Sequence, residues 1–216
     1  MAYLSWAIPE AARFGGVAAD ADTARMLHLL QVGATLPAPR DPAKRRELAE
    51  IAARLEGLYG KGKWCGTPVP GKAAPPCRDI LATEEIFQKS RDEAALREAW
   101  TGWHSISREM RPLYARFVEL GNEGAREIGF PDLGALWRSG YDMTPAELEA
   151  DVDRLWGEVK PLYDELHCYV RGRLQKLYGK VEVPDGKPIP AHLLGNIWAQ
   201  EWGYLYAELE PYPGVG

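Results

Sequence analysis

Between Thr144 and Gly179, apolar side chains recur at helical spacing over roughly thirty residues. This run begins with a capping box, in which Thr144 and Glu147 each satisfy a backbone N–H that a helix start leaves without a partner. Gly179 ends the run, and Pro161 predicts a kink near its middle. A helix of this length spans roughly 50 Å. It is the clearest helix of the sequence.

The rest of the sequence is also helical in pattern, without convincing strand alternation. Asp41 and Pro42 start a second amphipathic run that Gly60 closes. Residues 84–128 predict one long helix or two, and residues 191–209 predict a last helix before Pro211. The sequence thus predicts an all-α, multi-helix fold. The turn-rich residues 211–216 are expected to lead into further chain.

The sequence argues against nucleic-acid binding and against a membrane-spanning segment. The net charge of −5 and the lack of a basic stripe argue against nucleic-acid binding. No segment approaches the roughly 20 apolar residues of a membrane span, and residues 1–25 do not resemble a signal peptide. The eight tryptophans predict large buried or cleft-lining surfaces.

Two of the three cysteines bracket a loop rich in proline and glycine. Cys65 and Cys77 lack the C-x-x-C spacing and the nearby histidines of a zinc site, so a disulfide is favoured over metal binding. A disulfide would place the protein in an oxidising compartment. Cys168 is expected to be a free thiol in the core.

Three polar residues are expected to share one line of the last helix. His192, Asn196 and Gln200 are spaced four apart, and small residues lie beside them. Such a row suits the wall of a cleft, where amide and imidazole groups can donate to a carboxylate or carbonyl. The alternative is a buried helix whose polar groups bond to a neighbouring element.

Residues 188–202, PIPAHLLGNIWAQEW, resemble the PIPAHLLGNMWAQ-x-W segment of the angiotensin-converting enzyme family. Similar matches follow the family order: Trp100–Trp103 (W-x-G-W), residues 114–120 (YARFVEL), residues 137–141 (WRSGY) and residues 161–171 (PLY-x-x-LH-x-YVR). The resemblance is strong from Trp100 to Trp202. It implies a bacterial-type relative of large, helical, zincin-type peptidyl-dipeptidases with a central cleft.

The resemblance assigns roles to particular residues. Gln200 matches the glutamine that donates a hydrogen bond to the C-terminal carboxylate of the substrate, and Trp198 matches a cleft tryptophan beside it. Tyr141 matches a tyrosine that helps bind an activating chloride ion. Cys65 and Cys77 fall where the family has a small disulfide loop. His104 and Glu201 depart from the family, which has an arginine and a small hydroxyl residue there.

Family catalysis needs an H-E-x-x-H helix that holds zinc. The four histidines include no pair four residues apart. Residues 1–216 are therefore expected to form a partial peptidase domain, the cleft-wall helices before the zinc motif, with no catalytic or metal-binding residue. The isolated chain is expected to be inactive. Zinc would belong to the complete enzyme, chloride is a second candidate ion, and the partners would be the remaining chain and peptides with a free C-terminus.

The sequence leaves two other functions open. The chain could be a non-catalytic helical peptide-binding or interaction module, which would need a well-closed C-terminus. The hypothesis of a zinc enzyme that uses His192 with nearby carboxylates has weak support, because His192 and Glu201 lie nine residues apart and on different turns. Location is inferred indirectly: the disulfide and the family both favour a periplasmic or extracellular parent enzyme.

Overall fold

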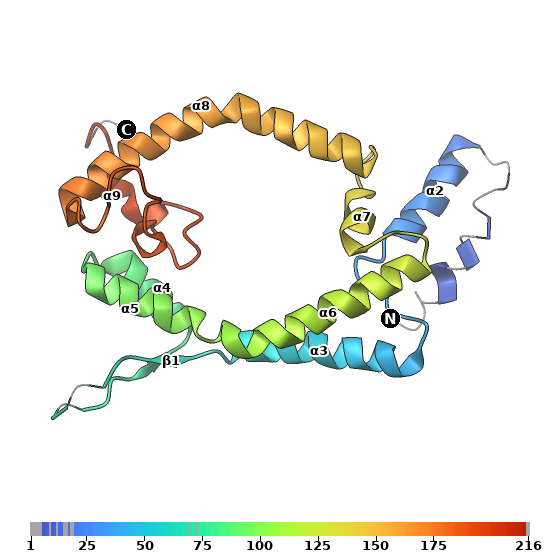
Figure 1. The fold of residues 1–216 in the computed structure, drawn as a ribbon, viewed down its shortest axis with the longest axis horizontal. Helices are drawn as coiled ribbons and strands as arrows, with labels where there is room; N and C mark the ends of the chain where they lie inside the picture. The colour runs from blue at the N-terminus through green and yellow to red at the C-terminus, as the bar shows by residue number, and fades with distance from the viewer. Residues whose placement is uncertain are drawn as a thin grey trace. The chain divides into compact units, whose positions relative to one another are not determined.

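The computed structural model describes residues 6–8, 10–11, 13–14, 17, 20–68, 70–71 and 73–214. Over these residues the protein is all-α, with one two-stranded antiparallel sheet (Figure 1). The elements are α2 (Ala21–Val32), α3 (Pro42–Gly60), β1 (Trp64–Cys65), β2 (Cys77–Arg78), α4 (Ile80–Lys89), α5 (Glu93–His104), α6 (Ser107–Glu127), α7 (Leu133–Arg138), α8 (Pro145–Tyr178) and α9 (Tyr206–Leu209). Two 3-10 turns, Ala191–Leu193 and Gly203–Leu205, precede α9. The predicted fold class is confirmed.

The capping box that starts α8 forms as predicted. The backbone N–H of Thr144 donates to the Glu147 carboxylate at 2.7 Å, and the Glu147 N–H donates to the Thr144 hydroxyl at 3.3 Å. Asp41 caps α3 in the same way, accepting from the Ala43 N–H at 2.7 Å. Both helices also end where their glycines predict. These boundaries are set by neighbouring residues, so the sequence alone sufficed to predict them.

Residues 84–128 contain three helices rather than one or two. Asp92 caps α5 by accepting from the Ala95 N–H at 2.8 Å, which separates α5 from α4. The hydroxyls of Ser105 and Ser107 donate to the carbonyls of Gly102 and His104, both at 2.7 Å. Side-chain hydroxyls that occupy backbone carbonyls compete with the helix, so α5 and α6 separate there.

The chain divides into two compact units, each with its own apolar core. Unit 1 comprises Met1–Gly57 with Glu109–Gly157, and unit 2 comprises Leu58–Arg108 with Glu158–Gly216. The buried cluster of unit 1 is made of Leu48, Ile51, Leu55 and Leu120. The larger cluster of unit 2 draws on β1, α4, α5, α8 and the segment after α8, and its buried members include Trp64, Trp103, Phe87, Leu96, Val170, Leu174, Leu193 and Ile197.

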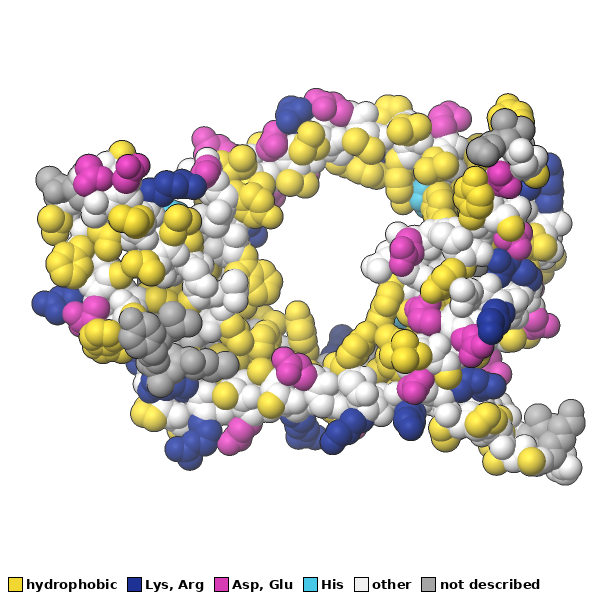
Figure 2. Space-filling model, turned by 180° about the vertical axis from the view of Figure 1, so that it is seen from behind, with side chains coloured by type: hydrophobic (Ala, Val, Ile, Leu, Met, Phe, Trp, Pro, Cys, Tyr) yellow, Lys and Arg dark blue, Asp and Glu magenta, His cyan; other side chains and the backbone are white. Residues whose placement is uncertain are grey.

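The apolar stripe of α8 is only partly buried. Val170 and Leu174 are buried, whereas Leu155, Leu162 and Leu166 are exposed. Figure 2 also shows apolar side chains uncovered on the face that it draws, with acidic and basic side chains interspersed. Within the described residues, no helix is both long enough and apolar enough to cross a bilayer.

The thiol of Cys168 is free, as expected, but it is exposed rather than in the core. Two residues along a helix correspond to a rotation of about 200°. Because Val170 faces the core, Cys168 faces almost the opposite way. The prediction of a core thiol is therefore wrong.

Candidate functional site

The last predicted helix is replaced by a tight loop over residues 194–202, flanked by the two 3-10 turns. Gly195 has φ +88°, and Ala199 has φ +54°, which is rare for a residue with a side chain. A Cβ on residue 195 would collide with the Glu201 carbonyl oxygen. The prediction that His192, Asn196 and Gln200 share a helix face is therefore wrong.

Asn196 organises this loop from the inside. Its side chain is 3% exposed, and its Oδ1 accepts from the backbone N–H groups of Trp198 at 3.1 Å and Gln200 at 3.2 Å. Its Nδ2 donates to Glu201 Oε1 at 3.0 Å. One buried amide thus replaces several helical hydrogen bonds and holds the backbone of the two predicted binding residues.

Trp198 lies in an aromatic group of unit 2. Its ring stacks on Tyr59 with centroids 6.3 Å apart and meets the edge of His104 at 5.9 Å. His104 stacks on Trp100 at 4.0 Å, and its Nδ1 lies 2.7 Å from the Trp100 carbonyl oxygen. A carbonyl only accepts, so Nδ1 carries the hydrogen and donates. These contacts fix one side of Trp198, and 41% of the residue stays exposed.

Gln200 and Glu201 follow on the exposed side of the loop. The Gln200 amide makes no hydrogen bond to another described residue, whereas its backbone is held by Asn196. The chain beyond the loop is anchored by an ion pair between Arg91 and Glu208, with Nε and Oε1 at 2.6 Å. Hydrogen bonds from Arg91 hold the pKa of the Glu208 carboxyl below its ordinary value. The loop is therefore held by Asn196 within it and by the Arg91–Glu208 pair after it, while the Gln200 side chain is available.

Glu84 supports the same loop from α4. Its Oε1 accepts from the backbone N–H of Ile197 at 3.3 Å. Burial raises the pKa of the Glu84 carboxyl above its ordinary value of 4.5, and the charge of Glu201 adds to this effect. The folded state therefore binds the Glu84 proton more tightly than the unfolded state does.

This raised pKa predicts a pH-dependent effect of Glu84→Gln. The contribution of protonated Glu84 to the free energy of unfolding is lost as the pH rises through the raised value, whereas glutamine does not titrate. Relative to the parent chain, the free energy of unfolding of the variant, measured in urea, should therefore be higher at about pH 7 than at about pH 4. Glu85→Gln is the matched control, because pairing with Lys89 lowers the Glu85 pKa and should give the opposite trend. If the free energies of unfolding of Glu84→Gln and the parent chain differed by the same amount at both pH values, the prediction would be contradicted.

Tyr141, the predicted chloride residue, belongs to unit 1 and not to the unit that holds Trp198 and Gln200. It lies between α7 and α8, and its side chain is 60% exposed. The adjacent Asp142 pairs with Arg25, with Oδ1 and Nη1 at 2.6 Å. The hydrogen bonds from Arg25 lower the pKa of the Asp142 carboxyl.

The histidines do not form a zinc site in this chain. His192 Nε2 lies 2.7 Å from Glu93 Oε1, not beside Glu201. The other three make different contacts: His28 with the Ser139 carbonyl, His104 with Trp100, and His167 with the rings of Tyr163 and Trp202. Over the described part of the chain, no group of three or more His, Cys, Asp or Glu side chains is placed to hold a metal. The donor set therefore does not fit zinc.

Cys65 and Cys77 form a disulfide. They face each other across β1 and β2, where Cys65 pairs with Cys77 and Trp64 pairs with Arg78. The disulfide, favoured over a metal site from the sequence, is thus present.

The sequence reasoning did not assign site roles to Asn196 as a loop organiser, to Glu84 as its support or to Tyr59 as the platform for Trp198. One signal was available, since Gly195-Asn196 is a typical turn dipeptide. Glu84 and Tyr59 lie more than a hundred residues before the loop residues that they contact, and no local pattern indicates such contacts.

The chain is similar to known proteins over nearly its whole length. The family model for angiotensin-converting enzyme, peptidase M2, matches residues 6–215. The angiotensin-converting enzyme of Oryctolagus cuniculus is 40% identical over 184 residues, which cover 82% of this chain and 13% of the relative. That of Sus scrofa is 41% identical over 180 residues (80% and 13%), and that of Theromyzon tessulatum is 39% identical over 173 residues (79% and 27%).

The chain thus spans between about an eighth and about a quarter of the length of these curated relatives. The match covers nearly the whole chain and includes the 194–202 loop. On this similarity, the chain belongs to the angiotensin-converting enzyme family of zinc metallopeptidases.

Proposed function

We propose that this chain forms part of the substrate cleft of a zinc peptidyl-dipeptidase, an enzyme that releases dipeptides from the free C-terminus of peptides. In this proposal Gln200 donates a hydrogen bond from its side-chain amide to the C-terminal carboxylate, and Trp198 lines the cleft beside it. Tyr141 contributes to a chloride site in unit 1. Anchoring the carboxylate sets which peptide bond is cleaved.

The observation that carries the proposal is the state of the Gln200 amide. Its backbone N–H is held by buried Asn196, its side chain is exposed, and no described residue occupies its amide group. A donor on a backbone that is already ordered loses little conformational entropy when it binds a ligand. Trp198, held by Tyr59 and His104, supplies an apolar surface on the same loop.

The proposal assigns binding, not catalysis, to these residues. The 216 residues contain no H-E-x-x-H motif, so the side chains that hold zinc in the complete enzyme are not among them. The isolated chain is accordingly expected to be inactive, as a partial peptidase domain whose partner is the remaining peptidase chain. The Cys65–Cys77 disulfide supports a periplasmic or extracellular location for the complete enzyme.

The test is the binding of a tripeptide with a free C-terminus to this chain, compared with the same tripeptide amidated. The free acid should bind about tenfold more tightly, because a hydrogen bond to a charged group is lost on amidation. Gln200→Ala should remove this preference. Gln88→Ala is the matched control, since Gln88 is also exposed and lies in the same unit but outside the loop.

Two results would decide against the proposal. Unchanged preference for the free acid in Gln200→Ala would remove Gln200 from the site and would favour the alternative, a non-catalytic peptide-binding module. One zinc per chain with chelator-sensitive dipeptide release would show that the chain is itself a complete catalyst.

A further inference from the structure

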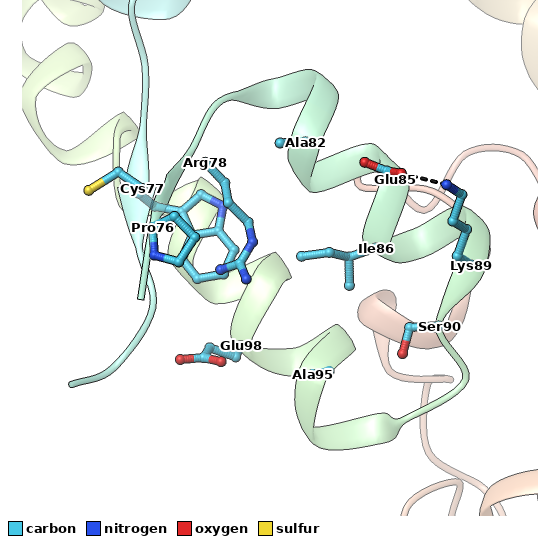
Figure 3. A pocket seen from close by; sticks show the side chains of 11 residues that line it. Pro76, Cys77, Arg78, Ala82, Glu85, Ile86, Lys89, Ser90, Ala95 and Glu98 are labelled. Atoms are coloured by element: carbon cyan, nitrogen blue, oxygen red, sulfur yellow. Dashed lines mark hydrogen bonds and ion pairs between the residues drawn. The ribbon is translucent and has the colours of Figure 1, made fainter. Parts of the chain in front are cut away.

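Unit 2 contains a cavity that lies between the disulfide hairpin, α4 and α5 (Figure 3). Its volume is about 600 Å³, within the range of sites that hold small molecules. The lining combines apolar and charged side chains, and none of them belongs to the 194–202 loop.

Arg78 supplies a positive charge that is not neutralised by a carboxylate of the residues that the structure describes. Its guanidinium carbon lies 5.3 Å from the ring centroid of Trp64, on the paired strand. Trp64 is buried, and its Nε1 donates to the Thr83 hydroxyl at 2.7 Å. Among the described residues, no carboxylate lies within ion-pairing distance of Arg78. The guanidinium is therefore held on an aromatic platform and remains available to an anion.

Glu98 supplies the opposite charge. Its Oε1 accepts from the backbone N–H of Thr67 at 2.7 Å, which ties the carboxylate to the hairpin. Glu98 is exposed, and its second oxygen makes no bond to another described residue. Glu85 and Lys89 also line the cavity, but they pair with each other at 2.5 Å and neutralise each other. Among the described residues that line the cavity, the uncompensated charges are thus Arg78 and Glu98.

The space between α4 and α5 is apolar. Figure 3 shows Ile86 projecting from α4 into the cavity, with Ala82 on the same helix and Ala95 on α5. Ile86 is half-buried, so part of its surface is still in contact with water. A small aliphatic group placed against Ile86 would remove apolar surface from water.

We propose that this cavity binds a zwitterionic ligand of the amino-acid type, a free amino acid or dipeptide with an apolar side chain. The ligand carboxylate pairs with Arg78, its ammonium group pairs with Glu98, and its side chain packs on Ile86. A simple anion is disfavoured because Glu98 repels it, and a long fatty acid is disfavoured because charged side chains surround the short apolar surface.

The first test uses the unmodified chain and L-leucine, followed by amide chemical shifts in NMR. Saturable shifts are expected at Arg78, Ile86 and Ala95. Leucinamide, which lacks the carboxylate, and N-acetyl-leucine, which lacks the ammonium group, should each bind at least about tenfold more weakly. Glycine should also bind more weakly, because it has no side chain to bury. Equal binding of leucine and leucinamide would overturn the proposal.

The second test uses variants that keep side-chain shape. Arg78→Gln should weaken leucine binding by about tenfold, and so should Glu98→Gln, which retains an oxygen for the Thr67 N–H. Arg108→Gln is the matched control, because Arg108 is exposed and does not line the cavity. Unchanged binding in Arg78→Gln, or shifts confined to the 194–202 loop, would contradict the assignment. Gln200→Ala should leave the leucine-induced shifts at Arg78, Ile86 and Ala95 unaltered, which separates this site from the proposed substrate cleft.

Discussion

Replacing Trp103 with alanine is expected to lower the free energy of unfolding by about 3–5 kcal/mol, the largest effect of any substitution considered for this chain. Trp103 is 1% exposed and belongs to the core cluster of unit 2. The loss combines the transfer of the indole from water with the cavity left behind, because the surrounding helices collapse only partly. Urea unfolding followed by circular dichroism measures it.

The same substitution should also weaken the candidate site. Trp103 meets the edge of Tyr59 with ring centroids 6.0 Å apart, and Tyr59 in turn stacks on Trp198. Leu81→Ala is the control, because Leu81 is 78% exposed in the same unit and should change stability by no more than about 0.5 kcal/mol. A loss below about 1 kcal/mol for Trp103→Ala would mean that the core of unit 2 is not packed as described.

Asn196→Ala is expected to cost about 2–4 kcal/mol, because the backbone N–H groups of Trp198 and Gln200 both lose their acceptor in a partly buried position. Glu201 loses the donor on Asn196 as well. Asn196→Ala should open the 194–202 loop more readily than it unfolds the rest of the chain. Native-state hydrogen exchange should show the amides of Trp198 and Gln200 exchanging at least about thirtyfold faster.

Asn196→Asp separates the two halves of this side chain. Aspartate keeps an oxygen for both backbone N–H groups, so their protection from exchange should largely persist. It removes the donor to Glu201 and adds a negative charge beside that residue, so the stability should still fall. If aspartate exposed both amides as much as alanine does, the side-chain oxygen of Asn196 would not be what holds the loop.

The local sequence predicted the boundaries of α3 and α8 correctly and the loop at 194–202 incorrectly. The start of α8 at Thr144 and Glu147 and the start of α3 at Asp41 depend on side chains within three residues of the groups they cap. The loop at 194–202 has apolar residues at helical spacing, and that pattern alone predicted a helix. The periodicity was outweighed by contacts that the pattern does not contain.

The candidate site depends on two kinds of information, family resemblance and tertiary contacts. Gln200, Trp198 and Tyr141 were named from family resemblance, and family membership is confirmed by the match over residues 6–215. Their roles stay proposals. Asn196 apart, the residues that contact Trp198 and Ile197 lie on α3, α4 and α5, far away in the sequence.

By itself, the sequence determined that this protein is helical, where α3 and α8 begin and end, and that it has the motifs of its family. These features depend on periodicity and on caps, which act over a few residues. Only the tertiary structure decided that Gly195 approaches the Glu201 carbonyl, that Glu84 holds Ile197, and that Arg78 rests on Trp64. The physical reason is that close packing and burial bring together groups whose separation along the chain carries no signal.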